Sequence, residues 1–242
     1  MSASRQVQYE LAALIAPTDP ARQLPEANNE RLLAILAEVR GREILHIGCV
    51  NHRLPESPAE ARHYLHYQLC RRFADSHVVG LDIEAQAIAQ LDRMGFDVVT
   101  GDAHNLPYRQ EFDTIVAGEL LEHLQNPGLF LTSCAGALKP GGRLVLSTPN
   151  VFTPLLSLMY WKNGERAFNP DHAVWFCPQT IRVLLARCGF AVTQLSFVDD
   201  LKPEATDSFW YKSFVAGWKG IRLLLPRRLR NTMVIVCELT PG

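Results

Sequence analysis

The sequence has no long hydrophobic run, no paired-cysteine motif and almost no net charge, and each absence excludes a class of protein. None of its segments approaches the ~18 consecutive apolar residues that are needed to span a bilayer. The apolar run near the start, Leu11–Ala16, is too short for the core of a secretion signal, and no cleavage-site pattern follows it. We therefore expect a cytoplasmic protein.

Cysteine usage supports the same compartment. Six cysteines occur in 242 residues, and no two of them form a Cys-x-x-Cys pair. Most lie in apolar or helical stretches, where a free cysteine behaves as a small hydrophobic side chain. This usage is typical of a reducing compartment and argues against a disulfide scaffold.

Acidic and basic residues nearly cancel, with 25 of the former, 24 of the latter and a formal net charge of −1. Such a balance argues against a protein that coats nucleic acid, so we expect no nucleic-acid partner. The charges are nevertheless unevenly distributed, because six basic residues and no acid lie between Asp207 and Glu238. The rest of the chain has 18 basic and 25 acidic residues, a net charge of −7.

The sequence does contain enough apolar material for a sizeable core, since 48% of its residues are hydrophobic and 20% are charged. At about 150 residues per domain, its length fits one large domain with appendages. Three prolines between residues 17 and 25 indicate an N-terminal arm, and Asn29 can cap a helix over Glu30–Arg40. We therefore divide the chain into an arm and helix, 1–40, and a main domain, 41–242.

Short apolar runs alternate with helical patterns through most of the main domain. The expected strands are Glu43–Ile47, Val78–Leu81, Phe96–Thr100, Phe112–Ala117, Arg143–Ser147, Phe190–Val198 and Thr232–Leu239, and the expected helices are Pro58–Phe73, Glu84–Met94, Pro127–Leu138 and Thr180–Cys188. This alternation predicts right-handed crossovers and a mostly parallel sheet. Most of the strands are continuous apolar runs, as expected of strands buried on both faces.

Glycine and acidic residues follow the first three strands directly. In an open α/β sheet, ligands bind beyond the carboxyl ends of the strands, near the point where the strand order reverses. Gly48 would let the backbone approach a ligand closely. Asp82 stands where an acid can hold both hydroxyls of a ribose, and Asp102 can accept a hydrogen bond from an exocyclic amine. These positions predict a nucleoside-binding site.

Six segments, in order, resemble the successive motifs of class I S-adenosylmethionine-dependent methyltransferases: ILHIGCV, VVGLDI, GDAHNLPY, FDTIVAGELLEHL, LKPGGRLVLSTPN and HAVWFCPQTIRVLLARCGF. The small-molecule branch, similar to ubiquinone-biosynthesis O-methyltransferases, is the nearest. The resemblance implies an α/β, doubly wound, mostly parallel seven-stranded sheet (a Rossmann-like methyltransferase fold) with an N-terminal helical arm and C-terminal cap or lid insertions. It also implies S-adenosylmethionine as the cofactor.

The resemblance further implies which residues contact that cofactor. It places Gly48 and Cys49 at the amino-acid part with His46 beside them, Asp82 and Ile83 at the ribose, Asp102 and Ala103 at the adenine, and Gly118 and Glu119 where the pocket closes. Each acid also has a structural alternative. Asp82 can cap a helix, Asp102 can stabilise a turn, and Glu119 can be an ordinary acid in a first helical turn.

The first motif departs from the family pattern, which is usually acid-x-Gly-x-Gly-x-Gly. His46 stands in the position of the acid, and Gly48 is the one glycine that remains. The following loop is long, because Gly48 and Asp82 lie 34 residues apart, against about 20 in the related dinucleotide fingerprint. A subgroup of methyltransferases from glycan-biosynthesis clusters is similar at this motif, and His52 and His66 would match its histidines.

Methyl transfer is an in-line displacement at a sulfonium carbon, so the protein mainly positions the nucleophile, at about 3–3.5 Å, and removes a proton. A hydroxyl nucleophile benefits from a base with a pKa near neutrality, which favours histidine. The candidate catalytic residues are His123, which can alternatively pack behind the site, and His172. The predicted reaction is O-methylation of a small-molecule, glycan or lipid-linked acceptor, with nitrogen and carbon less favoured.

Two segments are candidates for contact with the acceptor. A lid insertion over residues 151–178 contains Tyr160, Trp161 and Trp175, although its first part, Val151–Trp161, is equally consistent with a core segment. The basic aromatic segment, 208–230, is either an amphipathic helix with a solvated basic face or a contact for an anionic lipid headgroup or a phosphate-bearing acceptor.

Histidines are concentrated in the first part of the chain, with five of the eight between residues 46 and 77. Two sets of ligands from this region would have to converge to hold an ion, so we expect no metal. The main alternative to an enzyme is a binding or scaffold protein on a degenerate methyltransferase fold, suggested by the glycine-poor first motif. A nucleotide-dependent oxidoreductase would require G-x-G-x-x-G after the first strand, which is absent.

Overall fold

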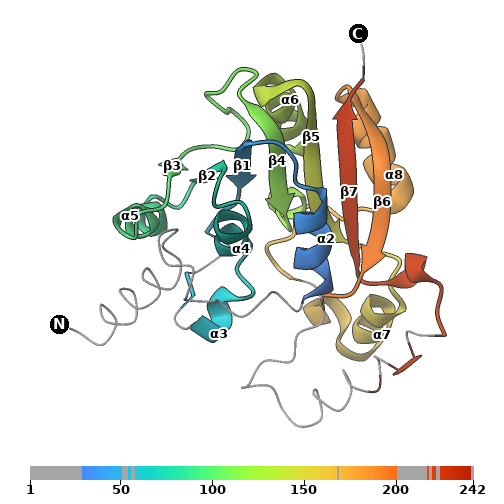
Figure 1. Ribbon diagram of the computed structural model, residues 1–242. Coiled ribbons are helices and arrows are strands. Elements are labelled where there is room, and N and C mark those ends of the chain that lie inside the picture. The colour runs from blue at the N-terminus through green and yellow to red at the C-terminus, as the bar shows by residue number, and fades with distance from the viewer. Residues whose placement is uncertain are drawn as a thin grey trace.

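A computed structural model describes residues 29–50, 54–55, 58–167, 169–200, 217, 220–221 and 224–240. A central sheet carries helices on both faces (Figure 1). The predicted arm before residue 29 and most of the basic aromatic segment lie outside the described residues. No helix of the described part is long and apolar enough to cross a membrane.

The sheet has seven strands in the order β3-β2-β1-β4-β5-β7-β6. Their bounds are β1 (Glu43–Ile47), β2 (His77–Asp82), β3 (Val98–Thr100), β4 (Phe112–Gly118), β5 (Leu138–Pro149), β6 (Phe190–Val198) and β7 (Thr232–Leu239). Strands β1 to β5 pair in parallel, and β7 is antiparallel to both of its neighbours. The predicted doubly wound, mostly parallel seven-stranded sheet is confirmed. The strand order reverses between β1 and β4, which is where such sheets bind ligands.

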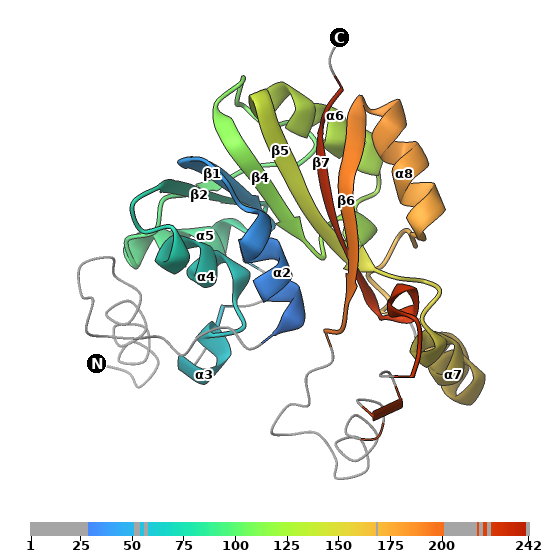
Figure 2. The ribbon, with the colours of Figure 1, turned by 45° about the vertical axis from the view of Figure 1, so that its right-hand side comes forward.

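Helices cover the two faces of the sheet unevenly (Figure 2). One face carries α2 (Glu30–Glu38), α4 (Leu65–Arg72) and α5 (Ala85–Arg93), and the other carries α6 (Pro127–Ala137) and α8 (Pro178–Arg187). Two further helices, α3 (Pro58–Ala61) and α7 (Pro154–Asn163), lie at the edge where β1 and β4 end. Short helical turns are η1 (Leu121–His123), η2 (Gly164–Ala167) and η3 (Arg227–Leu229).

Apolar side chains fill the space on both sides of the sheet. On β4, Ile115 packs in the cluster beneath α6 and α8, whereas its neighbour Val116 packs beneath α2 and α4. Both residues are fully buried. This alternation explains why the parallel strands are continuous apolar runs in the sequence.

The helix α2 begins where the sequence predicts. The side chain of Asn29 accepts hydrogen bonds from the backbone N–H groups of Arg31 and Leu32, as a helix cap does. Leu32 and Ile35 are buried against the sheet with β1, β4 and β5. The helix therefore forms part of the packed domain.

Two elements differ from the sequence prediction by more than two residues at an end. The helix expected over Pro58–Phe73 is divided into α3 and α4, because Tyr64 is extended and buried, and its hydroxyl donates to the backbone O of Val50 at 2.6 Å. The strand expected from Arg143 begins at Leu138, so Lys139–Gly142 also lies within β5, at an irregularity in its pairing with β4.

Candidate functional site

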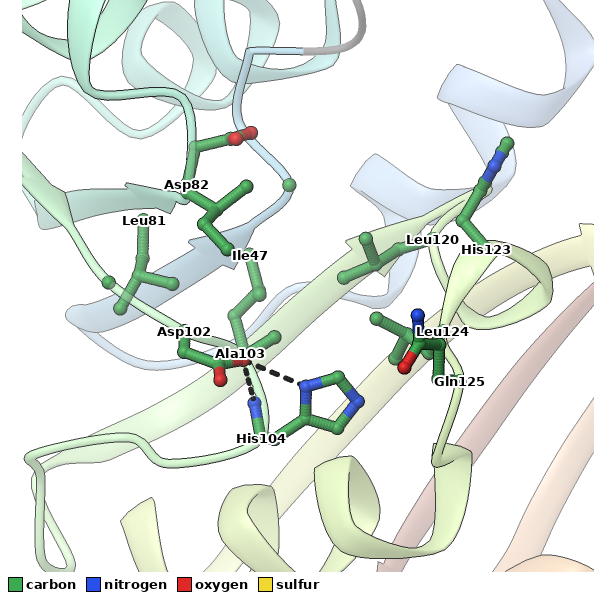
Figure 3. Close-up of a pocket in the computed structure, with 13 residues that line it drawn as sticks. Ile47, Leu81, Asp82, Asp102, Ala103, His104, Leu120, His123, Leu124 and Gln125 are labelled. Carbon is green, nitrogen blue, oxygen red and sulfur yellow. Dashed lines mark hydrogen bonds and ion pairs between the residues drawn. The ribbon is translucent and has the colours of Figure 1, made fainter. Parts of the chain in front are cut away.

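A pocket of about 360 Å³ lies where β1, β2 and β4 end (Figure 3). Six of the residues predicted for the site line it: Gly48, Asp82, Ile83, Asp102, Ala103 and His123. Asp82, Asp102 and His123 come from three different strand ends and surround the same space. The structure thus brings the predicted nucleoside contacts and one predicted base into a single pocket.

The turn after β1 brings its backbone to the pocket. Gly48 has a positive φ of 78°, a conformation that favours glycine, and its N–H donates to the backbone O of Leu81 at 2.8 Å. A Cβ built on Gly48 would also lie only 3.3 Å from Leu120 Cδ1. The positive φ and the close approach of Leu120 therefore explain why a glycine suits position 48.

Asp82 connects three segments at the edge of the pocket. Its Oδ2 accepts from the backbone N–H of Val50 at 2.9 Å, and its Oδ1 accepts from that of Glu84 at 3.1 Å. The carboxylate therefore fixes the β1 loop against the turn before α5, whose N-cap is Glu84, so Asp82 stabilises a strand-end turn and does not itself cap the helix. Since each carboxylate oxygen has two lone pairs, Asp82 can also accept from a ligand.

Asp102 forms a compact pair with His104, a pocket residue that the sequence analysis did not single out. Asp102 Oδ1 accepts from the backbone N–H of His104 at 2.9 Å and from its ring Nδ1 at 2.8 Å (Figure 3). These hydrogen bonds lower the pKa of Asp102. His104 Nε2 is buried and has no hydrogen-bond partner among the described residues. The sequence did contain a signal for His104, because the Asp-x-His spacing suits a turn that the Asp side chain closes.

Three predicted contacts lie in the interior, outside the pocket lining. His46, Cys49 and His66 are buried on or against β1 and β2, and the Nδ1 atoms of the two histidines are 3.3 Å apart. Burial lowers the pKa of His66 to about 4 and also lowers that of His46, so both rings are neutral at pH 7. Burial raises the pKa of the Cys49 thiol. These side chains therefore form part of the core under the pocket.

Gly118 and Glu119, predicted to close the pocket, turn the chain from β4 into η1 instead of lining it. A Cβ on Gly118 would lie 2.8 Å from Leu65 Cδ2 and 3.1 Å from a guanidinium nitrogen of Arg31, so neighbouring helices occupy that space. Glu119 has a positive φ of 53°, which is uncommon for a residue with a side chain. Its N–H donates to Ser147 Oγ at 3.1 Å, which fixes the turn to β5.

Both predicted bases lie on the same side of the pocket. The rings of His123, on η1, and His172, on the loop before α8, meet edge to face with centroids 4.7 Å apart. The ring of Trp175, a predicted substrate residue, lies 5.1 Å from that of His172. His123 Nδ1 donates to the backbone O of Asp171 at 3.2 Å. The two histidines are far apart in the sequence, but their rings are in direct contact in the fold.

Glu122 lies beside these histidines and is almost completely buried, with 1% of its surface exposed. Its Oε2 accepts from Thr148 Oγ1 at 3.0 Å, whereas its Oε1 has no partner among the described residues. Burial raises the pKa of Glu122 to about 8, and the nearby Glu119 adds to the shift. In the described part of the chain, ligand atoms of Glu122, His123 and His172 all lie within 4.8 Å of one another.

The remaining predicted acceptor contacts lie elsewhere. Tyr160 and Trp161 are on α7 and exposed, with 84% of Trp161 accessible, and Leu155 is the buried residue of that helix. The second predicted substrate histidine, His52, lies outside the described residues.

Comparison with known proteins identifies relatives of this chain. A family model described as a methyltransferase domain matches residues 20–195. A ubiquinone biosynthesis O-methyltransferase from Shewanella halifaxensis is 30% identical over 124 residues, which are 48% of this chain and 47% of the relative. The chain therefore spans about half the length of the curated relatives it matches.

Solved structures share the fold at low sequence identity. An S-adenosylmethionine-dependent methyltransferase from Archaeoglobus fulgidus has a TM-score of 0.57 at 20% identity, over 86% of this chain and 90% of that one. A magnesium protoporphyrin IX methyltransferase from Synechocystis, with bound SAH, has a TM-score of 0.57 at 13% identity, over 99% of this chain and 89% of that one.

Proposed function

This chain belongs to the methyltransferase-domain family, whose model matches most of it, and we propose that it methylates an oxygen atom of a small-molecule, glycan or lipid-linked acceptor. Membership of this family shows that the chain depends on S-adenosylmethionine. Our proposal concerns the acceptor, namely the atom that is methylated and the kind of molecule that carries it. The observation that carries it is that Gly48, Asp82 and Asp102 share one pocket with His123.

The pocket residues fit an adenosine-type cofactor. We assign the ribose hydroxyls to Asp82 and the adenine to Asp102 and His104, whose buried Nε2 has no partner among the described residues. Ile83 and Ala103 line the pocket beside these acids and would flank the base. The turn at Gly48 would accommodate the amino-acid part, because no side chain projects from it.

The histidine side of the pocket supplies the acceptor chemistry. The bound cofactor supplies an activated methyl group, so the chain must orient the acceptor and remove its proton. We assign this to His123, which lines the pocket, with His172 against its ring. As the acceptor oxygen loses its proton there, its lone pair forms the bond to the methyl carbon, and the carbon–sulfur electron pair remains on sulfur.

Oxygen is favoured over nitrogen by the relatives named above. The Shewanella relative is named an O-methyltransferase of ubiquinone biosynthesis, although it is matched over only 47% of its length. The similarity to glycan-cluster methyltransferases stays a prediction from the first motif alone.

A second surface supports a lipid-linked acceptor or an anionic lipid contact. Exposed side chains on and beside α7 and η3 form what we call the α7 surface: Phe152, Leu158, Tyr160, Trp161, Leu224, Arg227 and Arg228. η3 lies beside α7 in both views (Figures 1 and 2). Asn150, between β5 and α7, fixes η3 in place, since its side-chain nitrogen donates to the backbone O atoms of Arg228 and Arg230, each at 2.9 Å. Exposed aromatic rings beside cations suit the interface of an anionic membrane.

The test of the proposed function has two stages. Isothermal titration with S-adenosylmethionine and with its demethylated product should show binding to one site per chain. The protein is then incubated with labelled cofactor and matched phenols, catechols and amines, and the products are identified by mass spectrometry. A folded sample that binds neither ligand at millimolar concentration would contradict the enzyme assignment, and exclusive methylation of amines would contradict the choice of oxygen.

A further inference from the structure

A donor set suited to a metal ion lies beside the pocket, around His123. We propose that Glu122, His123 and His172 bind one divalent transition-metal ion, and that the acceptor oxygen coordinates this ion during methyl transfer. The second half of the proposal rests on the proposed function, whereas ion binding can be tested without it. Sequence spacing does not predict this site, because the three residues have no recognisable ligand pattern.

The geometry is close to that of a bound site. Ligand atoms of the three residues all lie within 4.8 Å of one another. Metal–ligand bonds of about 2.0–2.2 Å place two ligands of one ion at most ~4.4 Å apart. Small side-chain rotations would therefore bring all three into coordination.

Glu122 supplies an independent indication. With 1% of its surface exposed, it keeps one carboxylate oxygen, Oε1, without a hydrogen-bond partner among the described residues. An unsatisfied buried acceptor costs free energy, and a cation would remove that cost. The other oxygen, Oε2, accepts from Thr148 at 3.0 Å, which orients the carboxylate as outer partners of metal ligands do.

The ring of His123 is oriented as a ligand, and a backbone hydrogen bond holds the loop of His172 beside it. A carbonyl oxygen can only accept, so the contact between His123 Nδ1 and the backbone O of Asp171 places the proton on Nδ1 and the lone pair on Nε2. An imidazole that donates to a backbone carbonyl from its other nitrogen is the usual arrangement of a metal-bound histidine. The N–H of Ala173 donates to the backbone O of Glu122 at 2.8 Å, which holds the His172 loop against η1.

The donor types indicate the kind of ion. Two imidazoles and one carboxylate suit Zn²⁺, Mn²⁺, Fe²⁺ or Co²⁺, whereas Mg²⁺ and Ca²⁺ prefer oxygen ligands. Three protein ligands leave at least one position open for another oxygen. His123 also lines the cofactor pocket, so the open position would face the site of methyl transfer.

A coordinated ion would change how the acceptor loses its proton. Coordination lowers the pKa of a hydroxyl, so the proton passes to solvent and the oxygen remains on the ion as the nucleophile. Its lone pair then forms the bond to the methyl carbon, and the carbon–sulfur electron pair stays on sulfur. When the ion is bound, it takes over the deprotonation that the proposed function assigns to His123, because His123 Nε2 is then a ligand and no longer a base.

The experiment measures ion binding directly. The full chain is treated with EDTA, desalted, and titrated calorimetrically with ZnCl₂, MnCl₂ or MgCl₂. We expect one Zn²⁺ or Mn²⁺ per chain and much weaker Mg²⁺ binding. Each of the substitutions Glu122→Gln, His123→Ala and His172→Ala should weaken Zn²⁺ binding at least about tenfold, in line with the loss of a ligand interaction.

The matched control is His77→Ala. His77 lies on the surface between Glu43 and Asp97, at 2.7 and 2.8 Å, and is the obvious competing site. Its removal should leave Zn²⁺ affinity unchanged. Three results would overturn the proposal. They are the absence of one-to-one binding, a Zn²⁺ affinity in Glu122→Gln and His172→Ala that equals that of the wild type, and a loss of binding in His77→Ala. Titration of the same samples with S-adenosylmethionine separates this failure from failure of the proposed function.

Discussion

Asp82 is the residue on which the cofactor assignment can be tested most directly. Replacing it with alanine removes a charged acceptor that can hold both ribose hydroxyls, and hydrogen bonds to charged groups contribute about 1.5–3 kcal/mol each. We therefore expect Asp82→Ala to weaken S-adenosylmethionine binding by at least about 10- to 100-fold, which corresponds to the loss of one such hydrogen bond. Isothermal titration of wild type and variant measures the change.

Glu84→Ala is the matched control for this substitution. Glu84 is exposed, lies two residues away, and does not line the pocket. Its affinity for the cofactor should equal that of the wild type. An Asp82→Ala protein that is folded and binds as tightly as the wild type would show that Asp82 has only the structural role of holding Val50 and Glu84.

The buried histidine pair predicts how stability depends on pH. Burial lowers the folded-state pKa of His66 to about 4, below its ordinary value of 6.5. The unfolded chain therefore binds the proton first, and stability that is complete above pH 6.5 is lost as the pH falls towards 4. His66 alone would contribute a loss of about 3 kcal/mol. Urea unfolding of wild type and His66→Leu between these pH values should give a shallower dependence for the variant.

His77 provides a comparison of opposite sign. Hydrogen bonds to Glu43, and then to Asp97, raise the pKa of His77, so its stabilising effect is present at acid pH and is lost as the pH rises through the folded value. His77→Gln should therefore lower stability at acid pH relative to the wild type.

A His66→Leu protein with the wild-type acid dependence would refute the assignment of that dependence to the buried pair.

At the scale of elements, α7 shows what the sequence leaves open. The segment Val151–Trp161 suits a core or a lid equally, because its apolar residues have no single helical face. The structure buries Leu155 and exposes Trp161. Leu155→Ala should cost about 2–4 kcal/mol through the cavity it leaves. Trp161→Ser should change stability by no more than about 0.5 kcal/mol.

Urea unfolding at neutral pH distinguishes the two cases. A loss of more than about 1 kcal/mol in Trp161→Ser would mean that this ring packs in a core, and the α7 surface would then lose its main aromatic side chain. The Tyr160→Ser variant, also exposed on α7, repeats the test at a second ring.

The strands were predictable because a buried parallel strand has a strong local signal, a short apolar run bounded by turns. The division of α3 from α4 was not predictable, because it depends on the hydrogen bond from the Tyr64 hydroxyl to Val50, a residue outside the predicted helix. The early start of β5 likewise depends on an irregular pairing with β4. Tertiary contacts, not local preferences, decided both.

The site divides in the same way. Asp82 and Asp102 were predictable, because their positions at strand ends place them at the pocket whatever the rest of the fold does. His46 and His66 were expected at the ligand and lie in the core, because the sequence does not show which face of β1 or α4 is turned inward. The group of Glu122, His123 and His172 depends on a loop that packs against η1, and the spacing of these residues in the sequence does not predict that contact.

At the scale of the whole molecule, opposite charges are separated along the chain. Six basic residues lie between Asp207 and Glu238, while the rest of the chain has a net charge of −7. Arg227 and Arg228, at the start of η3, are exposed beside α7. The net charge of −1 therefore does not describe the field at this end of the molecule, because attraction between charges is local over a screening length of about 8 Å at physiological salt.

This separation predicts selective binding to anionic membranes. The protein should sediment with vesicles of phosphatidylglycerol and phosphatidylcholine but less with phosphatidylcholine alone, and binding should fall as salt is raised from low to physiological concentration. Arg227→Gln/Arg228→Gln should weaken it about 30-fold, since each of the two cations near such a surface contributes about 1 kcal/mol. Arg71→Gln/Arg72→Gln removes the same charge from α4 and should have little effect. Equal losses in both double variants would indicate a response to net charge, and the α7 surface would then have no specific part in membrane binding.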